Sequence, residues 1–120
     1  DKTLKLKSEC EIYIDQVANL GGWGYGMKSV EALSMGLCCA TNLLPQYESF
    51  LGQHPFVNIN KETIYDDLVK LVEDKNAIKE KRVAGREWVQ KTHGVDAVIK
   101  STYELYLKQG WIQELPNELT

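Results

Sequence analysis

Residues 21–36, GGWGYGMKSVEALSMG, decide the fold of this chain. The stretch opens with four of the chain's nine glycines, continues as a run of good helix formers and stops at Gly36. A β-rich run, residues 11–15, comes before it. Because glycine often caps the C-terminal end of a helix, the pattern predicts a strand, a glycine-rich loop and a helix over residues 27–35.

A glycine-rich loop at the start of a helix is suited to binding phosphate groups. Glycine lets the backbone approach a ligand closely, and the first N–H groups of a helix have no partner inside it and lie at the positive end of the helix dipole. Lys28 would add a positive charge, whereas Glu31, one turn beyond Met27, is placed to accept hydrogen bonds from sugar hydroxyls. The alternative is a turn that packs the helix tightly on a sheet, and the glycines alone leave both interpretations open.

The full string resembles the donor-binding segment of the group 1 (family 4) retaining glycosyltransferases, which have the GT-B fold. That segment is roughly Glu-Gly-Phe-Gly, four residues, then Glu-Ala-Met-Ala-x-Gly. Residues 24–26, GYG, match Gly-Phe-Gly, and residues 31–36, EALSMG, match the second half. The resemblance implies that a nucleotide-sugar is bound by Gly24, Tyr25, Gly26, Met27, Lys28 and Glu31. Tyr25 could stack on a base or shield the phosphates, or it could simply pack in the core.

One position departs from the family pattern. The family's first glutamate, which helps hold the donor sugar, falls on Trp23, whose side chain cannot accept a hydrogen bond. Some relatives that lack this glutamate carry Asp-Gln at the end of the preceding strand, and Asp15-Gln16 matches that variant. These three residues are therefore expected to border the sugar, and whether the Asp-Gln pair replaces the lost function stays open.

Composition indicates one globular domain over residues 1–120. Hydrophobic residues make up 43% and charged residues 26%, and the net charge of −3, with no basic run, disfavours nucleic acid as a partner. No apolar run approaches about 20 residues, and no signal-peptide pattern is visible in this sequence. Cys10, Cys38 and Cys39 have no metal-ligand spacing, so we expect small buried hydrophobes in a reducing cytoplasm, with no metal or cofactor. The full-length protein could sit peripherally at a membrane.

The rest of the chain continues the alternation of strands and helices. Strands are expected at 11–15, 37–41 and 56–60, and helices at 45–51, 61–74, 76–91 and 95–108, with 111–120 as a tail that docks or frays. The residues expected to face the core from the last three helices are Ile64, Tyr65, Leu68, Leu71, Val72, Ala77, Ala84, Trp88, Val89, Val98, Thr102, Tyr103 and Tyr106. The order predicts an α/β fold, a partial Rossmann-like three-layer sandwich with about three parallel strands.

His54, His93 and Glu48 are expected at the surface rather than in catalysis. His54 precedes a proline in a turn, and His93 stands at a helix end where it can complement the dipole. No Ser, Cys or Asp lies at a triad-like spacing from either histidine. Glu48 matches a glutamate of the family, but a solvent-facing side chain is the more common situation.

The resemblance covers about residues 10–106 and corresponds to the second half of the family's C-terminal lobe. In the family, the basic residues that hold the diphosphate and the N-terminal acceptor domain lie outside this region, so the resemblance implies that they belong to a longer protein. The start at Asp1 rather than Met, with a core-like strand from residue 11, separately suggests a piece of a longer protein. The edge of strand 11–15 would then be unpaired. We expect self-association through this edge, or poor solubility.

We weigh three functions for this sequence. The first is the donor-binding part of a glycosyltransferase that moves a hexosyl group from a UDP-, GDP- or ADP-sugar to a glycan or lipid acceptor, as in polysaccharide biosynthesis; the chain alone would be inactive. The second is a non-catalytic GT-B-like module that binds a ligand or a protein. The third, a dehydrogenase-like domain, needs an acidic residue after the next strand, where Thr41-Asn42 stand instead.

Overall fold

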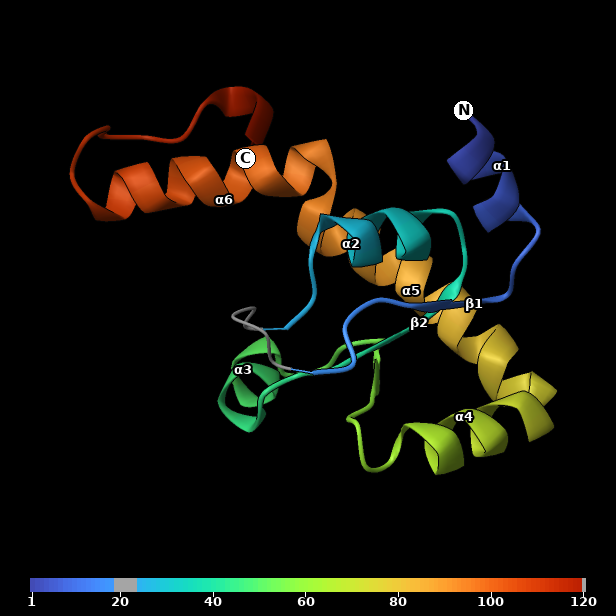
Figure 1. The fold of residues 1–120 in the computed structure, drawn as a ribbon. Helices are drawn as coiled ribbons and strands as arrows, with labels where there is room; N and C mark the ends of the chain where they lie inside the picture. The colour runs from blue at the N-terminus through green and yellow to red at the C-terminus, as the bar shows by residue number, and fades with distance from the viewer. Residues whose placement is uncertain (19–23, 120) are drawn as a thin grey trace.

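The computed structural model describes residues 1–18 and 24–119. Three parallel strands form one sheet in the order β1-β2-β3 (Figure 1). The strands are β1 (Ile12–Ile14), β2 (Cys38–Thr41) and β3 (Val57–Asn58). The helices are α1 (Lys2–Ser8), α2 (Met27–Ser34), α3 (Pro45–Leu51), α4 (Ile64–Glu73), α5 (Lys75–His93) and α6 (Val95–Lys108), and a short 3-10 helix, η1, spans Asn117–Leu119. The predicted α/β class with a small parallel sheet is confirmed.

The central strand β2 is buried on both faces, as its continuous apolar run predicts. Successive side chains of a strand point to opposite faces, so the two adjacent cysteines enter two different cores. One core contains Leu33, Cys39, Leu43 and Phe56, and the other contains Cys38, Leu71 and Ile78. Helix α2 therefore covers one face of β2 and α4 the other, and they lie on opposite sides of the strands (Figure 1).

Helix α2 is fixed at its C-terminal end by Gly36, which the sequence singled out, and by residues of α5, which it did not. Gly36 has a φ of 81°, a left-handed conformation that glycine adopts without strain, which confirms it as the cap. The Arg82 Nε of α5 donates to the Gly36 carbonyl over 2.5 Å. Further along α5, a Cβ on Gly85 would lie 2.7 Å from Leu33 Cδ2. The absence of a side chain at Gly85 thus lets α5 cross closely over α2.

Several predictions about burial are wrong. Helix α6 buries no residue completely, and Tyr106 is 37% exposed, so it is not a core residue. In α4, Leu71 is buried whereas Tyr65 is 76% exposed. In α5 the buried residues are Ile78 and Gly85, and the predicted Ala84 is exposed. Cys10 is exposed, unlike the other two cysteines.

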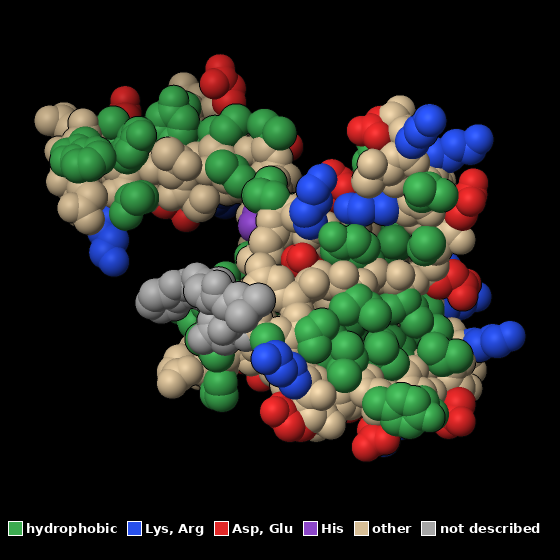
Figure 2. All heavy atoms as spheres, in the orientation of Figure 1, with side chains coloured by type: hydrophobic (Ala, Val, Ile, Leu, Met, Phe, Trp, Pro, Cys, Tyr) green, Lys and Arg blue, Asp and Glu red, His purple; other side chains and the backbone are tan. Residues whose placement is uncertain are grey.

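The described part of the chain leaves apolar surface uncovered. Strand β1 is an edge strand, and Ile14 is 42% exposed. Figure 2 shows a broad hydrophobic patch over the sheet and α4. On α4, Val69 and Val72 are exposed. The tail after α6 turns back along that helix (Figure 1), and the Trp111 N–H donates to the Tyr106 carbonyl over 2.9 Å. Among the described residues, no helix combines the length and apolar character needed to cross a bilayer.

Candidate functional site

The start of α2 is an open helix N-terminus at the carboxyl end of a parallel sheet. Gly26 is the N-cap residue and offers no side-chain bond to the helix. The N–H groups of Met27 and Lys28 have no acceptor among residues 1–18 and 24–119, and the Met27 side chain is 77% exposed. In open α/β sheets, ligands bind beyond the carboxyl ends of the strands. As far as the described residues go, this helix start therefore leaves two donors without an acceptor, in the position where such sheets bind anions.

Asp15 lies beside this helix start. It follows β1 directly, and its Oδ2 accepts a hydrogen bond of 2.5 Å from the Ser29 hydroxyl of α2. The same oxygen is 3.9 Å from the position that a Cβ would take on Gly26. A carboxylate is stabilised at a helix N-terminus by the dipole, but it repels a phosphate. A diphosphate is therefore favoured only on the side of the helix start that faces away from Asp15, and sugar hydroxyls are favoured beside it.

Gln16 joins the ends of two strands through its backbone. Its carbonyl accepts a hydrogen bond of 2.6 Å from the Asn42 N–H, just after β2. Asn42 in turn donates through Nδ2 to the Ile59 carbonyl over 2.8 Å, just after β3. The carboxyl ends of all three strands are thus tied together next to the predicted site. Trp23, the third residue expected to border the sugar, lies outside the described residues.

Glu31 is paired with two lysines. Its Oε1 is 2.5 Å from Lys7 Nζ of α1, and its Oε2 is 3.5 Å from Lys28 Nζ. The hydrogen bond from Lys7 is the main cause that lowers the pKa of Glu31, and its reciprocal effect raises the pKa of Lys7. The Glu31 side chain stays 32% exposed. The carboxylate is therefore ionised, fixed on one side and still open to a ligand.

Tyr25 packs into an aromatic cluster rather than projecting as a free platform for a base. Its ring stacks on Phe56 at 4.8 Å between centroids and meets Trp88 edge-on at 5.3 Å. Its hydroxyl lies 3.0 Å from His93 Nε2. The sequence left open whether Tyr25 stacks on a ligand or packs in the core, and in the structure it packs in the core. His93 is half-buried against this cluster rather than free at the surface, and it lies in the last turn of α5, where a helix-dipole partner was the other expectation.

Burial in this cluster raises the pKa of Tyr25 to about 12, against about 10 in an unfolded chain. The unfolded chain therefore loses this proton first, and stability falls as the pH rises from about 10 to about 12. We expect Tyr25→Phe, which cannot ionise, to remove this part of the alkaline loss, at a cost of about 1 kcal/mol at neutral pH for the lost hydroxyl contact. Urea denaturation at neutral pH measures the cost of the lost contact, and urea denaturation across the alkaline range measures the change in pH dependence. Tyr65→Phe, at an exposed tyrosine, should keep the wild-type pH profile, and an unchanged profile in Tyr25→Phe would contradict the prediction.

Glu48 and His54 form a structural bridge. Glu48 Oε1 lies 3.2 Å from His54 Nε2, and Glu48 Oε2 accepts a hydrogen bond of 2.9 Å from Asn58 Nδ2 of β3. The His54 side chain is only 11% exposed, so the expectation of a surface histidine is wrong for His54. This bridge ties α3 to the end of the sheet and gives Glu48 a role within the fold.

Among the described residues, no three His, Cys, Asp or Glu side chains gather as a metal site.

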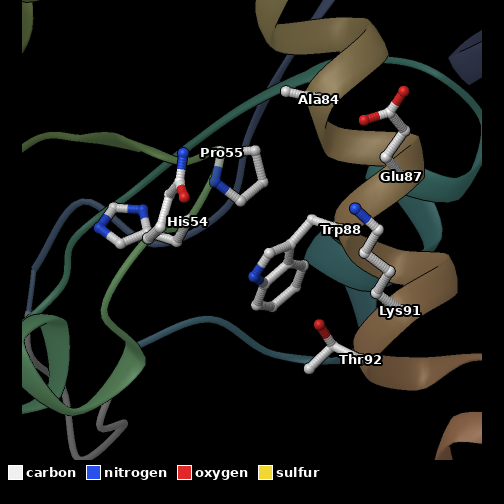
Figure 3. Close-up of a pocket in the computed structure, with 8 residues that line it drawn as sticks. His54, Pro55, Ala84, Glu87, Trp88, Lys91 and Thr92 are labelled. Carbon is white, nitrogen blue, oxygen red and sulfur yellow. The ribbon is translucent and has the colours of Figure 1, made fainter.

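A cavity of about 380 Å³ lies between the segment before β3 and α5 (Figure 3). Its lining residues are Gln53, His54, Pro55, Ala84, Glu87, Trp88, Lys91 and Thr92. None of the residues predicted from the glycine loop lines it. In Figure 3 the Trp88 indole projects from α5 between Pro55 and Thr92, and the same ring contacts Tyr25. Sequence reasoning missed this cavity because its walls come from segments without any shared pattern.

Comparisons with protein-family models, with curated proteins and with solved structures found no match. The interpretation of the site therefore depends on its geometry. That geometry brings together the helix start at Met27 and Lys28, the carboxylate of Asp15 and the carboxylate of Glu31. Donors for an anion and acceptors for hydroxyl groups thus lie on one helix and its adjoining strand end.

Proposed function

We propose that this chain is the nucleotide-sugar-binding part of a retaining glycosyltransferase of the GT-B type, the second half of its C-terminal, Rossmann-like lobe. The observation that carries the proposal is a helix start on the carboxyl edge of a parallel sheet, where the N–H groups of Met27 and Lys28 have no acceptor within residues 1–18 and 24–119. These N–H groups would stabilise the diphosphate as it gains charge on leaving the sugar, which requires no metal. Glu31 would accept the ribose hydroxyls of a UDP-, GDP- or ADP-sugar.

The position of Glu31 supports this division of roles. It lies one helical turn beyond Met27, so both project from the same side of α2. Its carboxylate is ionised and partly exposed, and hydrogen bonds to a charged acceptor are the stronger kind. A ligand with an anionic group at the helix start and neighbouring hydroxyls over Glu31 matches a nucleoside diphosphate.

A second candidate, a non-catalytic module with the same ancestry, is favoured by Asp15. In the family variant that lacks the loop glutamate, Asp15-Gln16 would border the sugar. In this chain one oxygen of Asp15 is committed to the Ser29 hydroxyl at 2.5 Å, which leaves less of the carboxylate for a sugar. The two candidates differ in chemistry: both bind a ligand at α2, but only the enzyme transfers a glycosyl group.

Titrating the isotope-labelled chain with UDP, GDP and ADP tests the binding site by nuclear magnetic resonance. We expect weak, saturable shifts of the amide signals of Tyr25 to Lys28 with at least one nucleotide, because the chain supplies only part of the diphosphate contacts. Inorganic phosphate should shift the same signals less, since it lacks the ribose. Shifts spread over the lysines of α5 and α6, with none at the start of α2, would refute the site.

Strand β1 lies at the edge of the sheet, with a neighbour on one side only among the described residues. We propose that β1 pairs with a strand outside the described residues, either in an N-terminal part of a longer protein or in a second copy of the chain. The exposed Ile14 and the apolar surface over α4 favour such a contact. Light scattering at high concentration should show association of the chain on its own, and a monodisperse monomer would exclude the second copy.

We also propose a cytoplasmic location. The thiols of Cys38 and Cys39 are buried and form no disulfide, which agrees with a reducing compartment.

A further inference from the structure

Lys7 is unusual among the lysines of the chain because it is almost withdrawn from solvent. Its side chain is 11% exposed, whereas that of Lys28 is 64% exposed. The Lys7 ammonium lies 2.5 Å from Glu31 Oε1 and 4.4 Å from the centroid of the Tyr13 ring of β1. A cation over an aromatic face is attracted by the ring. The ammonium is thus held by two groups, the Tyr13 ring of the sheet and the Glu31 carboxylate of α2.

This arrangement determines what Glu31 can do. Exposed ion pairs between long side chains are weak because both chains must be ordered, but here Lys7 is already ordered by burial and by Tyr13. A carboxylate has about four lone-pair positions, and Lys7 occupies one of them on Oε1. Lys28 stands farther away, at 3.5 Å from Oε2, with most of its side chain in solvent. Glu31 therefore keeps positions for two incoming hydroxyl groups while its orientation is fixed.

We propose that Lys7 is a positioning residue for ribose recognition: it holds the Glu31 carboxylate in the orientation that accepts the 2′- and 3′-hydroxyls of a nucleoside diphosphate. The inference rests on the proposed function, since it needs a nucleotide at the start of α2. Preordering an acceptor lowers the entropy lost on binding. Helix α1 thus becomes part of the site although it lies outside the glycine segment. Figure 2 shows basic side chains where α1 approaches α2.

The experiment separates an effect through Glu31 from simple attraction of phosphate by a lysine. UDP, GDP and ADP are titrated into the wild-type chain, and the nucleotide that binds best is compared with its 2′-deoxy analogue. The wild type should prefer the ribonucleotide. Lys7→Met should weaken ribonucleotide binding about tenfold and remove most of that preference, while Lys7→Arg should restore it. Lys5→Met, at an exposed lysine of the same helix, is the matched control and should change neither.

The possible outcomes are distinct. If the ribonucleotide and the 2′-deoxy analogue weaken equally in Lys7→Met, Lys7 acts on the phosphates and the inference is overturned. If Lys7→Met binds like the wild type, the inference is overturned while the proposed function stands. If the wild-type chain binds none of the three nucleotides, both are overturned. Should Lys7→Met fail to fold in thermal denaturation, Lys7→Gln, which keeps a donor without the charge, is measured instead and should show the same loss of preference in part.

Discussion

Leu33→Ala is expected to lower the free energy of unfolding by about 2–5 kcal/mol, the usual range for a leucine removed from a packed core. Leu33 is fully buried, in the core with Cys39, Leu43 and Phe56. It also lies where α5 crosses α2, because its Cδ2 fills the space beside Gly85. Because Leu33 is enclosed on all sides, we expect little relaxation into the space it leaves. Urea denaturation measures the change.

Leu105→Ala supplies the matched control. Leu105 is a leucine of α6 that is 52% exposed, and its removal should cost less than about 1 kcal/mol. Equal costs at Leu33 and Leu105 would show that the α2–α5 contact does not form the core. The comparison keeps the chemistry of the substitution the same and changes only the burial.

Gly85 allows a sharper version of the same test. In the wild type, Gly85→Ala should destabilise the chain, since the new Cβ would lie 2.7 Å from Leu33 Cδ2 and overpacking costs about 1–3 kcal/mol. In the Leu33→Ala background that methyl group is gone, and the higher helix propensity of alanine should then stabilise the chain by up to about 1 kcal/mol. The change of sign is a coupling between neighbours. Additive effects of the two substitutions would contradict the contact.

The elements of the sequence that follow local rules were predicted well. Helix α3 has the predicted bounds because Pro45 sets its first turn, and α2 is terminated as predicted by a left-handed Gly36, which directly follows the C-cap residue Met35. The burial of β2 followed from its continuous apolar run. The helix predicted from residue 61 begins only at Ile64, because residues 61–63 form a turn in which Asn60 Oδ1 accepts hydrogen bonds from the N–H groups of Glu62 and Thr63. In each case the determining residues lie within a few positions of one another.

The contacts that shape the candidate site could not be predicted, because they join residues far apart in sequence. Ser29 binds Asp15 across 14 positions, Lys7 binds Glu31 across 24, and Tyr25 meets His93 across 68. The role of Gly85 was missed for a related reason. In the sequence, a glycine within a helical pattern indicates only weak helix propensity. The close approach of α5 to α2 at Gly85 becomes visible only from the position of Leu33. A hydrophobic pattern predicts which face of a helix is apolar, but not whether another element covers it, as the exposed Tyr106 illustrates.

Glu31→Gln in the full-length glycosyltransferase that the proposal implies is expected to lower kcat/KM for sugar transfer about 10–100-fold. The amide keeps the shape of the side chain but removes the charge that strengthens its hydrogen bonds, and a charge-assisted bond is worth roughly 1.5–3 kcal/mol. Ribose is remote from the bond that breaks, so its contacts are similar in the ground state and the transition state. The loss should therefore appear mainly as a higher KM, with kcat nearly unchanged.

Two comparisons make this result specific to the site. Glu104→Gln, at an exposed glutamate of α6, should transfer sugar like the wild type. Glu31→Gln also leaves the Lys7 ammonium without its carboxylate, so thermal denaturation must show that the variant is folded at the assay temperature. A folded Glu31→Gln protein with wild-type kcat/KM would refute the ribose contact. A wild-type protein that binds a nucleotide but transfers no sugar from its UDP-, GDP- or ADP-activated forms would instead favour the non-catalytic module, since the donors at Met27 and Lys28 would then hold a ligand without any bond being broken.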